Sequence, residues 1–174
     1  AEYRRPPARP IENAALVDLG RDLFFDPIIS ATGKTSCATC HRPERAFTDG
    51  RARAAAISGA PLQRNTPSLW NLAWGKHYFW DGRAASLEEQ AAMPIENAAE
   101  MGADWNILLR TLQGDAALMT EFRSAFPGDT PLSKETVTKA LASYVRSLVS
   151  PPTRFDAWID GDANALSPTE LRGF

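Results

Sequence analysis

The two cysteines of this sequence lie three residues apart, and a histidine directly follows the second, in Cys37-Ala38-Thr39-Cys40-His41. This spacing is that of the c-type haem attachment motif. Two thiols placed in this way reach the two vinyl groups on one edge of a porphyrin and bond to them as thioethers. The adjacent imidazole then lies under the ring and gives a nitrogen to the iron. The motif predicts one haem c, attached through Cys37 and Cys40, with His41 as the proximal iron ligand.

Three other interpretations compete with the haem. A Cys-x-x-Cys redox pair would need a strand-to-helix setting, and the sequence shows none. A zinc site would need four ligands, and the remaining histidine, His77, lies at an unusual spacing. The third alternative is a chance match. The haem is favoured because both cysteines of the chain fall inside the motif, and covalent haem implies assembly outside the reducing cytosol.

The composition is that of an ordinary globular protein. The chain has 174 residues, of which 44% are hydrophobic and 23% charged, about one domain's worth by length. A net charge of −2 gives no reason to expect nucleic-acid binding. No apolar run approaches the ~20 residues that span a membrane. The polar, Pro-rich start at Ala1 fits a mature protein whose signal peptide has been removed.

The hydrophobic pattern is helical, without convincing strand alternation, so we expect an all-α fold. Residues 1–10 predict an extended N-terminal arm and residues 11–174 the domain itself. Within it, a helix over 11–25 precedes the haem motif, and 42–67 is a long loop. Further helices are expected at 69–74, from Ser86 to a stop at Pro94, from Asp104 through Leu112 and from Asp115 through Phe126. Another helix begins at Ser133 and is ended by Pro151-Pro152, and the last begins at Ser167. The last has little chain after it, so we expect the natural protein to continue beyond Phe174.

Several segments outside the haem motif follow one another in the order found in one family. They are Leu19 to Asp26, Ala46 to Gly50, Arg64 to Leu69, Phe79 to Arg83, Leu87 to Gln90, Pro94 to Asn97, Glu100 to Gly102, Phe155 to Asp162 and Glu170 to Phe174. Together they resemble the bacterial di-haem cytochrome c peroxidases, including the MauG-like enzymes, over nearly the whole chain. The resemblance implies a cytochrome c-like domain with long loops that carries the peroxidatic haem. The family's second domain, with an electron-transfer haem, is expected beyond Phe174.

The resemblance also implies roles for individual residues. It places Glu100 over the distal face of the haem as the acid/base of peroxide cleavage, with Gln90 and Pro94 nearby to shape the pocket. Trp80 matches a tryptophan that relays electrons between the two haems. Asn65 resembles the one side-chain ligand that this domain gives to an interdomain Ca²⁺, so we expect a helical, Ca²⁺-sensitive domain edge there. Without the resemblance, these would be ordinary surface, packing and turn residues.

The loop of residues 51–63 departs from the family pattern. Many of these peroxidases carry a histidine there, which ligates the peroxidatic iron in the resting enzyme, and this chain has none. We interpret His77 as a packed or propionate-side histidine rather than as a substitute ligand. The resting haem is therefore expected to be open, as in the MauG-like branch, which oxidises protein side chains.

The predicted function is that of a periplasmic, haem-dependent peroxidase-type oxidoreductase, which reacts with H₂O₂ and takes electrons from a partner protein. In a MauG-like sub-branch it would oxidise Trp or Tyr side chains of a partner protein. The alternative is a simple electron-transfer cytochrome, which would need a strong sixth iron ligand such as Met93 or Met101. Glu100 and the missing loop histidine favour the enzyme.

Overall fold

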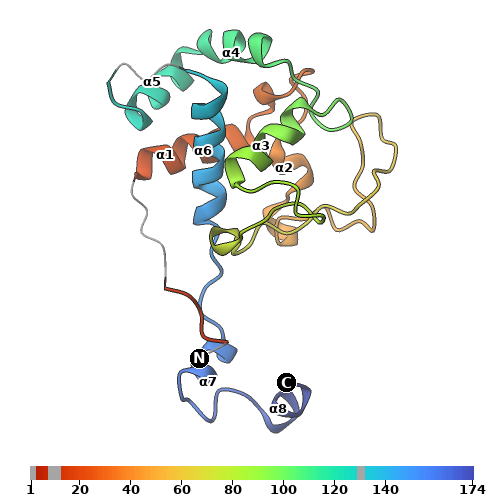
Figure 1. The fold of residues 1–174 in the computed structure, drawn as a ribbon, viewed down its shortest axis with the longest axis vertical. Helices are drawn as coiled ribbons and strands as arrows, with labels where there is room; N and C mark the ends of the chain where they lie inside the picture. Colours follow the sequence, from red (N-terminus) through yellow and green to blue (C-terminus); the bar gives the residue numbers. More distant parts are fainter. Residues whose placement is uncertain (1–2, 8–12, 129–131) are drawn as a thin grey trace.

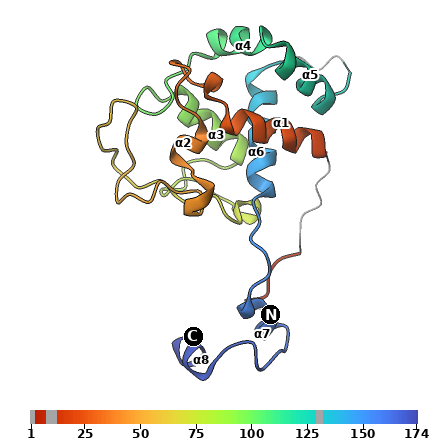
Figure 2. The same cartoon turned by 180° about the vertical axis from the view of Figure 1, so that it is seen from behind.

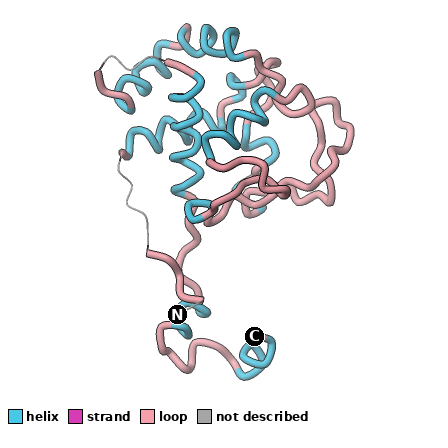
Figure 3. Tube along the Cα trace, viewed as in Figure 1, coloured by secondary structure: helices cyan, strands magenta, loops and turns pink. Residues whose placement is uncertain are grey.

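The computed structural model describes residues 3–7, 13–128 and 132–174. Figure 1 shows a main body of helices and long loops, from which the chain runs down to a small unit that contains α7 and α8. Figure 2 gives the same arrangement from behind, and Figure 3 separates the helices from the loops that connect them.

The described residues form eight α-helices. They are α1 (Ala14–Phe25), α2 (Cys37–Cys40), α3 (Leu87–Glu96), α4 (Trp105–Gln113), α5 (Ala116–Ala125), α6 (Lys134–Ser147), α7 (Arg154–Ile159) and α8 (Pro168–Gly173). Short 3₁₀ helices lie at Pro27–Ile29, Pro43–Arg45 and Leu72–Trp74. Between residues 42 and 84, the β-type backbone pairing of the described chain is limited to isolated bridges. The expected all-α class is confirmed.

The centre of the main body is the crossing of α1 and α6. Helix α3 packs against α6, while α2 and α5 pack against α1. At the crossing, a Cβ atom built on Gly20 would lie 1.9 Å from the backbone oxygen of Ala140. No side chain fits in that space, so the two backbones approach as closely as they do only because residue 20 is glycine. The largest fully buried side chains around this centre are Leu19, Leu23, Phe24, Ile29, Leu87, Ile95, Leu112 and Val137.

Helix α3 is aligned on α6 by an ion pair at each end. Arg146, in the last turn of α6, donates to Glu88 in the first turn of α3 at 2.7 Å. Lys134, at the start of α6, pairs with Glu96 at the end of α3. The two helices therefore run antiparallel. Half-exposed pairs of this kind contribute only ~0–1 kcal/mol each, so we assign them mainly to setting the register of α3.

Most helix starts follow the capping signals in the sequence. The Oδ1 atom of Asp104 accepts the N–H of Asn106 at 2.8 Å, and Asp115 does the same for Ala117 at 2.9 Å. Ser133 and Ser167 also cap their helices as expected. Helix α1 begins at Ala14, capped by Asn13, and residues 11 and 12 of the predicted helix lie outside the described residues.

Three predicted details are wrong, and one helix was not predicted. Pro94 does not stop α3, which continues to Glu96. Proline removes one N–H and crowds the preceding turn, but the ion pair at Glu96 and the core position of Ile95 hold the final turn. Helix α6 ends at Ser147, before the two prolines, because the N–H of Ser150 donates to Oδ1 of Asn71 at 3.0 Å and Pro151 has no N–H to donate. The helix expected over 69–74 is only the 3₁₀ turn at 72–74, and α7 was not predicted.

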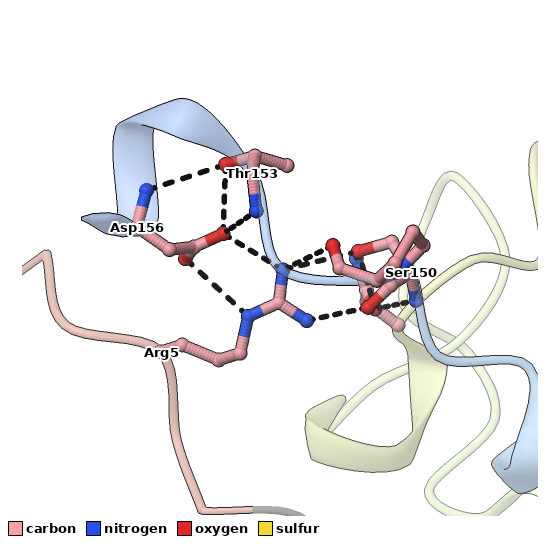
Figure 4. A network of polar contacts seen from close by, with 6 residues as sticks. Arg5, Ser150, Thr153 and Asp156 are labelled. Atoms are coloured by element: carbon pink, nitrogen blue, oxygen red, sulfur yellow. Dashed lines mark hydrogen bonds and ion pairs between the residues drawn. The ribbon is translucent and has the colours of Figure 1, made fainter. Parts of the chain in front are cut away.

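Arg5 joins the N-terminal segment to the start of α7 (Figure 4). Its guanidinium donates to both carboxylate oxygens of Asp156, at 3.3 and 3.0 Å. It also donates to the backbone oxygens of Ser150 at 2.6 Å and Pro151 at 3.0 Å. The bond from Arg5 holds the pKa of Asp156 well below its usual value. Of the predicted arm, residues 3–7 form neither helix nor strand, and residues 1–2 and 8–10 lie outside the described residues.

The aromatic rings of this small unit contact one another. Tyr3, Phe155 and Trp158 each pack against Phe174, with ring centroids 5.3 to 5.4 Å apart. Phe174 is nonetheless 62% exposed. Among the described residues of the whole chain, no helix has the length and apolar character needed to cross a membrane.

Replacing Gly20 by alanine tests the α1–α6 crossing. The added methyl group would meet the Ala140 backbone oxygen, so the helices must separate. We expect Gly20→Ala to lower the free energy of unfolding by about 1–3 kcal/mol or more. The matched control is Gly114→Ala, since Gly114 has right-handed helical backbone angles and a Cβ atom there would make only ordinary contacts, the nearest at 3.4 Å from the Thr111 backbone oxygen. It should change stability by less than about 1 kcal/mol. Equal effects in chemical denaturation would contradict the close crossing.

Candidate functional site

The Cys-x-x-Cys-His motif forms a single helical turn, α2, that packs against α1. The turn is started by Ser36, whose backbone N–H donates to Oγ1 of Thr39 at 3.0 Å. Cys37 and Cys40 lie at its two ends and are not joined by a disulfide. His41 is the residue that ends the turn, and its N–H bonds to the Cys37 carbonyl at 2.9 Å.

The His41 imidazole is oriented by a backbone carbonyl. Its Nδ1 atom lies 2.8 Å from the oxygen of Phe47. A carbonyl only accepts, so Nδ1 carries the proton and Nε2 keeps its lone pair. This is the tautomer that a metal-ligating histidine requires, and such a second bond raises its basicity as a ligand.

The loop after His41 folds back to bring that carbonyl into place. The N–H of Phe47 bonds to the Arg42 carbonyl at 2.8 Å, and the N–H of Arg42 bonds to the Thr48 carbonyl at 3.2 Å. Ala46 and Phe47 both have left-handed backbones, with φ of 53° and 58°. Each such residue costs roughly 1–2 kcal/mol, and strain of this kind gathers at functional sites.

Burial favours the uncharged forms of all three residues of the motif. It lowers the pKa of His41, against the opposing effect of the Phe47 and Pro67 backbones. It raises the pKa of the Cys37 thiol to about 12 and raises that of Cys40 as well. A dithiol redox catalyst needs the opposite shift, so these values disfavour a redox pair.

These residues fit a covalently bound haem. Two thiols one helical turn apart can form thioethers, and a neutral imidazole with a free Nε2 can bind iron. Within the described residues, there is no group of three or more His, Cys, Asp or Glu side chains that could hold a metal ion by themselves.

Helix α3 and the turn after it carry three other predicted site residues, Gln90, Pro94 and Glu100. Gln90 and Pro94 are half-buried and four positions apart, so they share one face of the helix. Beyond Glu96 the chain reverses, and the N–H of Met101 returns to the Pro94 carbonyl at 3.2 Å. The reversal places Glu100 close to the end of the helix that carries Gln90 and Pro94.

The carboxyl group of Glu100 is partly withdrawn from water. Burial raises its pKa above the ordinary value, while a bond from Asn97 and the positive charge of Arg83 act in the opposite direction. The Nδ2 atom of Asn97 donates to Oε1 of Glu100 at 2.7 Å. The charge of Glu100 in turn raises the pKa of Cys40. The turn that carries Glu100 and the helix that carries Cys40 are therefore close enough to interact electrostatically.

Trp80 lies at the surface, where its side chain is 60% exposed. Its Nε1 atom donates to the backbone oxygen of Asn65 at 3.1 Å. Beside it, Asp81 pairs with Arg64 and Arg83, each at 2.9 Å. These contacts hold Trp80 in one place without burying it, so it is not a core packing residue. Asn65 is also exposed and lies in irregular chain, so the helical edge predicted there is wrong.

The remaining histidine and the methionines differ from one another in burial. His77 is exposed, so it is not packed in the core, and its alternative place beside a haem propionate stays a prediction. Met101 is only 4% exposed and belongs to the hydrophobic core. Met93, on α3, is half-buried.

Two features of the site were not anticipated. The Phe47 carbonyl acts through its backbone, and no residue type in the sequence signals such an acceptor. Asn97 could have been found, because it lies three residues before Glu100 at the end of a predicted helix, where an amide commonly bonds to the local turn.

A family model described as di-haem cytochrome c peroxidase matches residues 14–164. The chain is 42% identical, over its whole length, to the methylamine utilization protein MauG of Methylorubrum extorquens and covers 51% of that protein. It is 36% identical, over 99% of its length, to the cytochrome c peroxidase Ccp of Escherichia coli and covers 38% of it. The chain thus spans about half the length, or less, of these relatives.

Solved structures agree with the sequence comparisons. A MauG-like protein associated with microbial copper homeostasis superimposes with a TM-score of 0.85 and 34% identity, over 99% of this chain and 52% of that one. The di-haem peroxidase BthA of Burkholderia thailandensis gives a TM-score of 0.76 and 26% identity, over 96% of this chain and 46% of that one. The sequence, the fold and the residues matched agree: this chain belongs to the di-haem cytochrome c peroxidase family.

Proposed function

We propose that this chain is the peroxidatic haem domain of a di-haem, peroxidase-type oxidoreductase that reacts with H₂O₂. The observation that carries the proposal is that two groups of this domain, His41 and Glu100, have pKa values shifted in opposite directions. His41 is held neutral with a free Nε2, and Glu100 is a partly buried carboxyl with a raised pKa. Haem c, attached through Cys37 and Cys40, would supply the iron that binds peroxide and the electrons that break its O–O bond.

The chain's own residues would divide the remaining work. His41 would give Nε2 to the iron, and its bond to the Phe47 carbonyl fixes the ring and would strengthen the ligand. Oε1 of Glu100 is engaged by Asn97, so Oε2 would be the oxygen that takes a proton from one peroxide oxygen and returns it to the departing one. Gln90 and Pro94 would shape the space around that carboxyl.

The proposal extends to the electron supply and the partner. Trp80, fixed at the surface by the Asn65 carbonyl, is the residue we assign to electron relay toward a second haem in a C-terminal domain. Electrons would come from a partner protein in the periplasm. The absence of a histidine in the loop 51–63 supports an open resting iron, which fits oxidation of partner Trp or Tyr side chains as in the MauG-like branch.

An electron-carrier role with Met101 as the sixth iron ligand is disfavoured by the position of that residue. Met101 is buried in the core and is held by backbone bonds from its N–H to Asn97 and Pro94. Bringing its sulfur to an iron would open that core, and the exposed apolar surface would cost stability.

The covalent attachment of the haem can be tested by extraction. In acidified butanone, the haem of the loaded protein should stay with the polypeptide, because thioether bonds survive acid. A variant with both Cys37→Ala and Cys40→Ala should release its haem to the organic phase. Release from the unaltered protein would refute attachment at this motif.

Glu100→Gln tests the acid/base role. Glutamine keeps the size of the side chain and an oxygen for Asn97, but it cannot exchange the proton. We expect the full-length, haem-loaded variant to react with H₂O₂ at least ~100-fold more slowly, as followed by rapid-mixing absorption at the Soret band. The matched control is Glu44→Gln, an exposed carboxyl close to His41 in the chain, which should react at the unaltered rate. A Glu100→Gln variant that also reacts at that rate would remove Glu100 from the mechanism.

Calcium binding at Asn65 needs ligands from outside this chain. Ca²⁺ takes six to eight oxygens, and the described residues form no acidic cluster there. We predict that chelation with EGTA lowers the thermal midpoint of the full-length protein. Asn65→Ala should abolish that response, while its backbone oxygen still binds Trp80. If chelation changes neither stability nor peroxide reactivity, the calcium role is wrong.

A further inference from the structure

Asn97 is the residue on which the turn carrying Glu100 is built. Its backbone oxygen accepts the N–H groups of Glu100, Met101 and Gly102, at 2.9, 3.1 and 2.9 Å. Its side-chain Oδ1 accepts the N–H of Ala99 at 3.0 Å. Its own N–H closes the last turn of α3 on the Met93 carbonyl at 3.0 Å. These bonds use every backbone group of Asn97 and the oxygen of its amide.

The amide nitrogen of Asn97 is left for the carboxylate. Nδ2 donates to Oε1 of Glu100 at 2.7 Å, a short bond typical of an ionised acceptor. Because Oδ1 is already bonded to Ala99, the amide cannot flip without losing that bond as well, so the donor points toward Glu100. The same turn thus fixes both the backbone and one oxygen of the side chain.

The charged and titratable groups that face Glu100 are few among the described residues. Arg83 lowers the pKa of Glu100 through its charge, and the Cys40 thiol is influenced by Glu100. The guanidinium of Arg83 is itself paired with Asp81 at 2.9 Å and lies 3.5 Å from the centre of the Phe79 ring. Asn97 is therefore the group that contacts the carboxylate directly, and Arg83 acts on it through charge alone.

We propose that Asn97 is a positioning residue for Glu100: its amide N–H holds Oε1 of the carboxylate and directs Oε2 to the proton exchange with peroxide. This inference rests on the proposed acid/base role of Glu100. A donor to the ionised carboxylate favours that form. Asn97 thereby counteracts the desolvation of Glu100 and keeps the group ionised, as a base must be, at lower pH.

The variant Asn97→Asp separates this role from the structural one. Aspartate has the same shape, keeps an oxygen for the Ala99 N–H and leaves the backbone bonds of the turn in place. It replaces the donor with a negative charge beside Glu100. The limb of the pH profile on which the H₂O₂ reaction rate rises should therefore move to higher pH, by about half a unit or more. The measurement is rapid-mixing absorption on the full-length, haem-loaded protein.

Three further variants show which group causes the shift of the pH profile. Asn106→Asp adds the same charge at an exposed position of α4 and should leave the profile unchanged. Asn97→Ser removes the amide without adding charge and should give a smaller upward shift. In Asn97→Asp combined with Glu100→Gln, the slow residual reaction should show the same pH profile as Glu100→Gln alone.

The outcomes separate the two proposals. A Glu100→Gln variant with the unaltered rate would defeat the acid/base role and this inference with it. A slow Glu100→Gln variant, together with an unshifted profile in Asn97→Asp and Asn97→Ser, would overturn the role of Asn97 and leave the proposed function intact. A shift that persists in the Glu100→Gln background would also overturn it, because Asn97 would then act through another group.

Discussion

The crossing of α1 and α6 is the constraint on which the rest of the structure depends. The two sides of the proposed site belong to different helices: α2, which carries the cysteines and leads into His41, packs on α1, and α3, which leads into Glu100, packs on α6. The distance between His41, the proposed iron ligand, and Glu100, the proposed acid/base, is therefore set by how closely α1 and α6 approach. Gly20 permits contact with the Ala140 backbone, and any larger residue there would move both sides of the site apart.

Hydrogen bonds then orient the two groups of the proposed site: the Phe47 carbonyl binds His41, and the Asn97 amide binds Glu100. His41 must stay neutral to bind iron, and burial together with the Phe47 carbonyl gives it one proton, on Nδ1. In its proposed role, Glu100 must be able both to take and to return a proton, so a pKa raised by desolvation suits it. The bond from Asn97 limits how far that desolvation raises the pKa of Glu100. Neither group would be set in this way by its residue type alone.

The sequence was informative where a local rule decides the structure. The haem motif, the caps at Asp104, Asp115 and Ser133 and the all-α class could be predicted, because spacing, capping oxygens and periodicity act within a few residues. Pro94 was misjudged because its local cost is outweighed by the packing of α3 on α6, which no window of sequence shows. The Phe47 carbonyl was missed for a similar reason: two left-handed residues aim it, and neither is a glycine. The exposure of His77 and Trp80 likewise depends on the long loops around them.

The spin state of the ferric haem that we propose to be attached at Cys37 and Cys40 tests the central claim most directly. If His41 is its one protein ligand and the side facing Glu100 is open, electron paramagnetic resonance of the full-length, resting protein should show an axial high-spin ferric signal that accounts for one iron. Its intensity should persist in Glu100→Gln, because glutamine leaves the iron open. A resting protein whose ferric haem signals are all low-spin would contradict the account, since a sixth ligand would then occupy the position that peroxide needs.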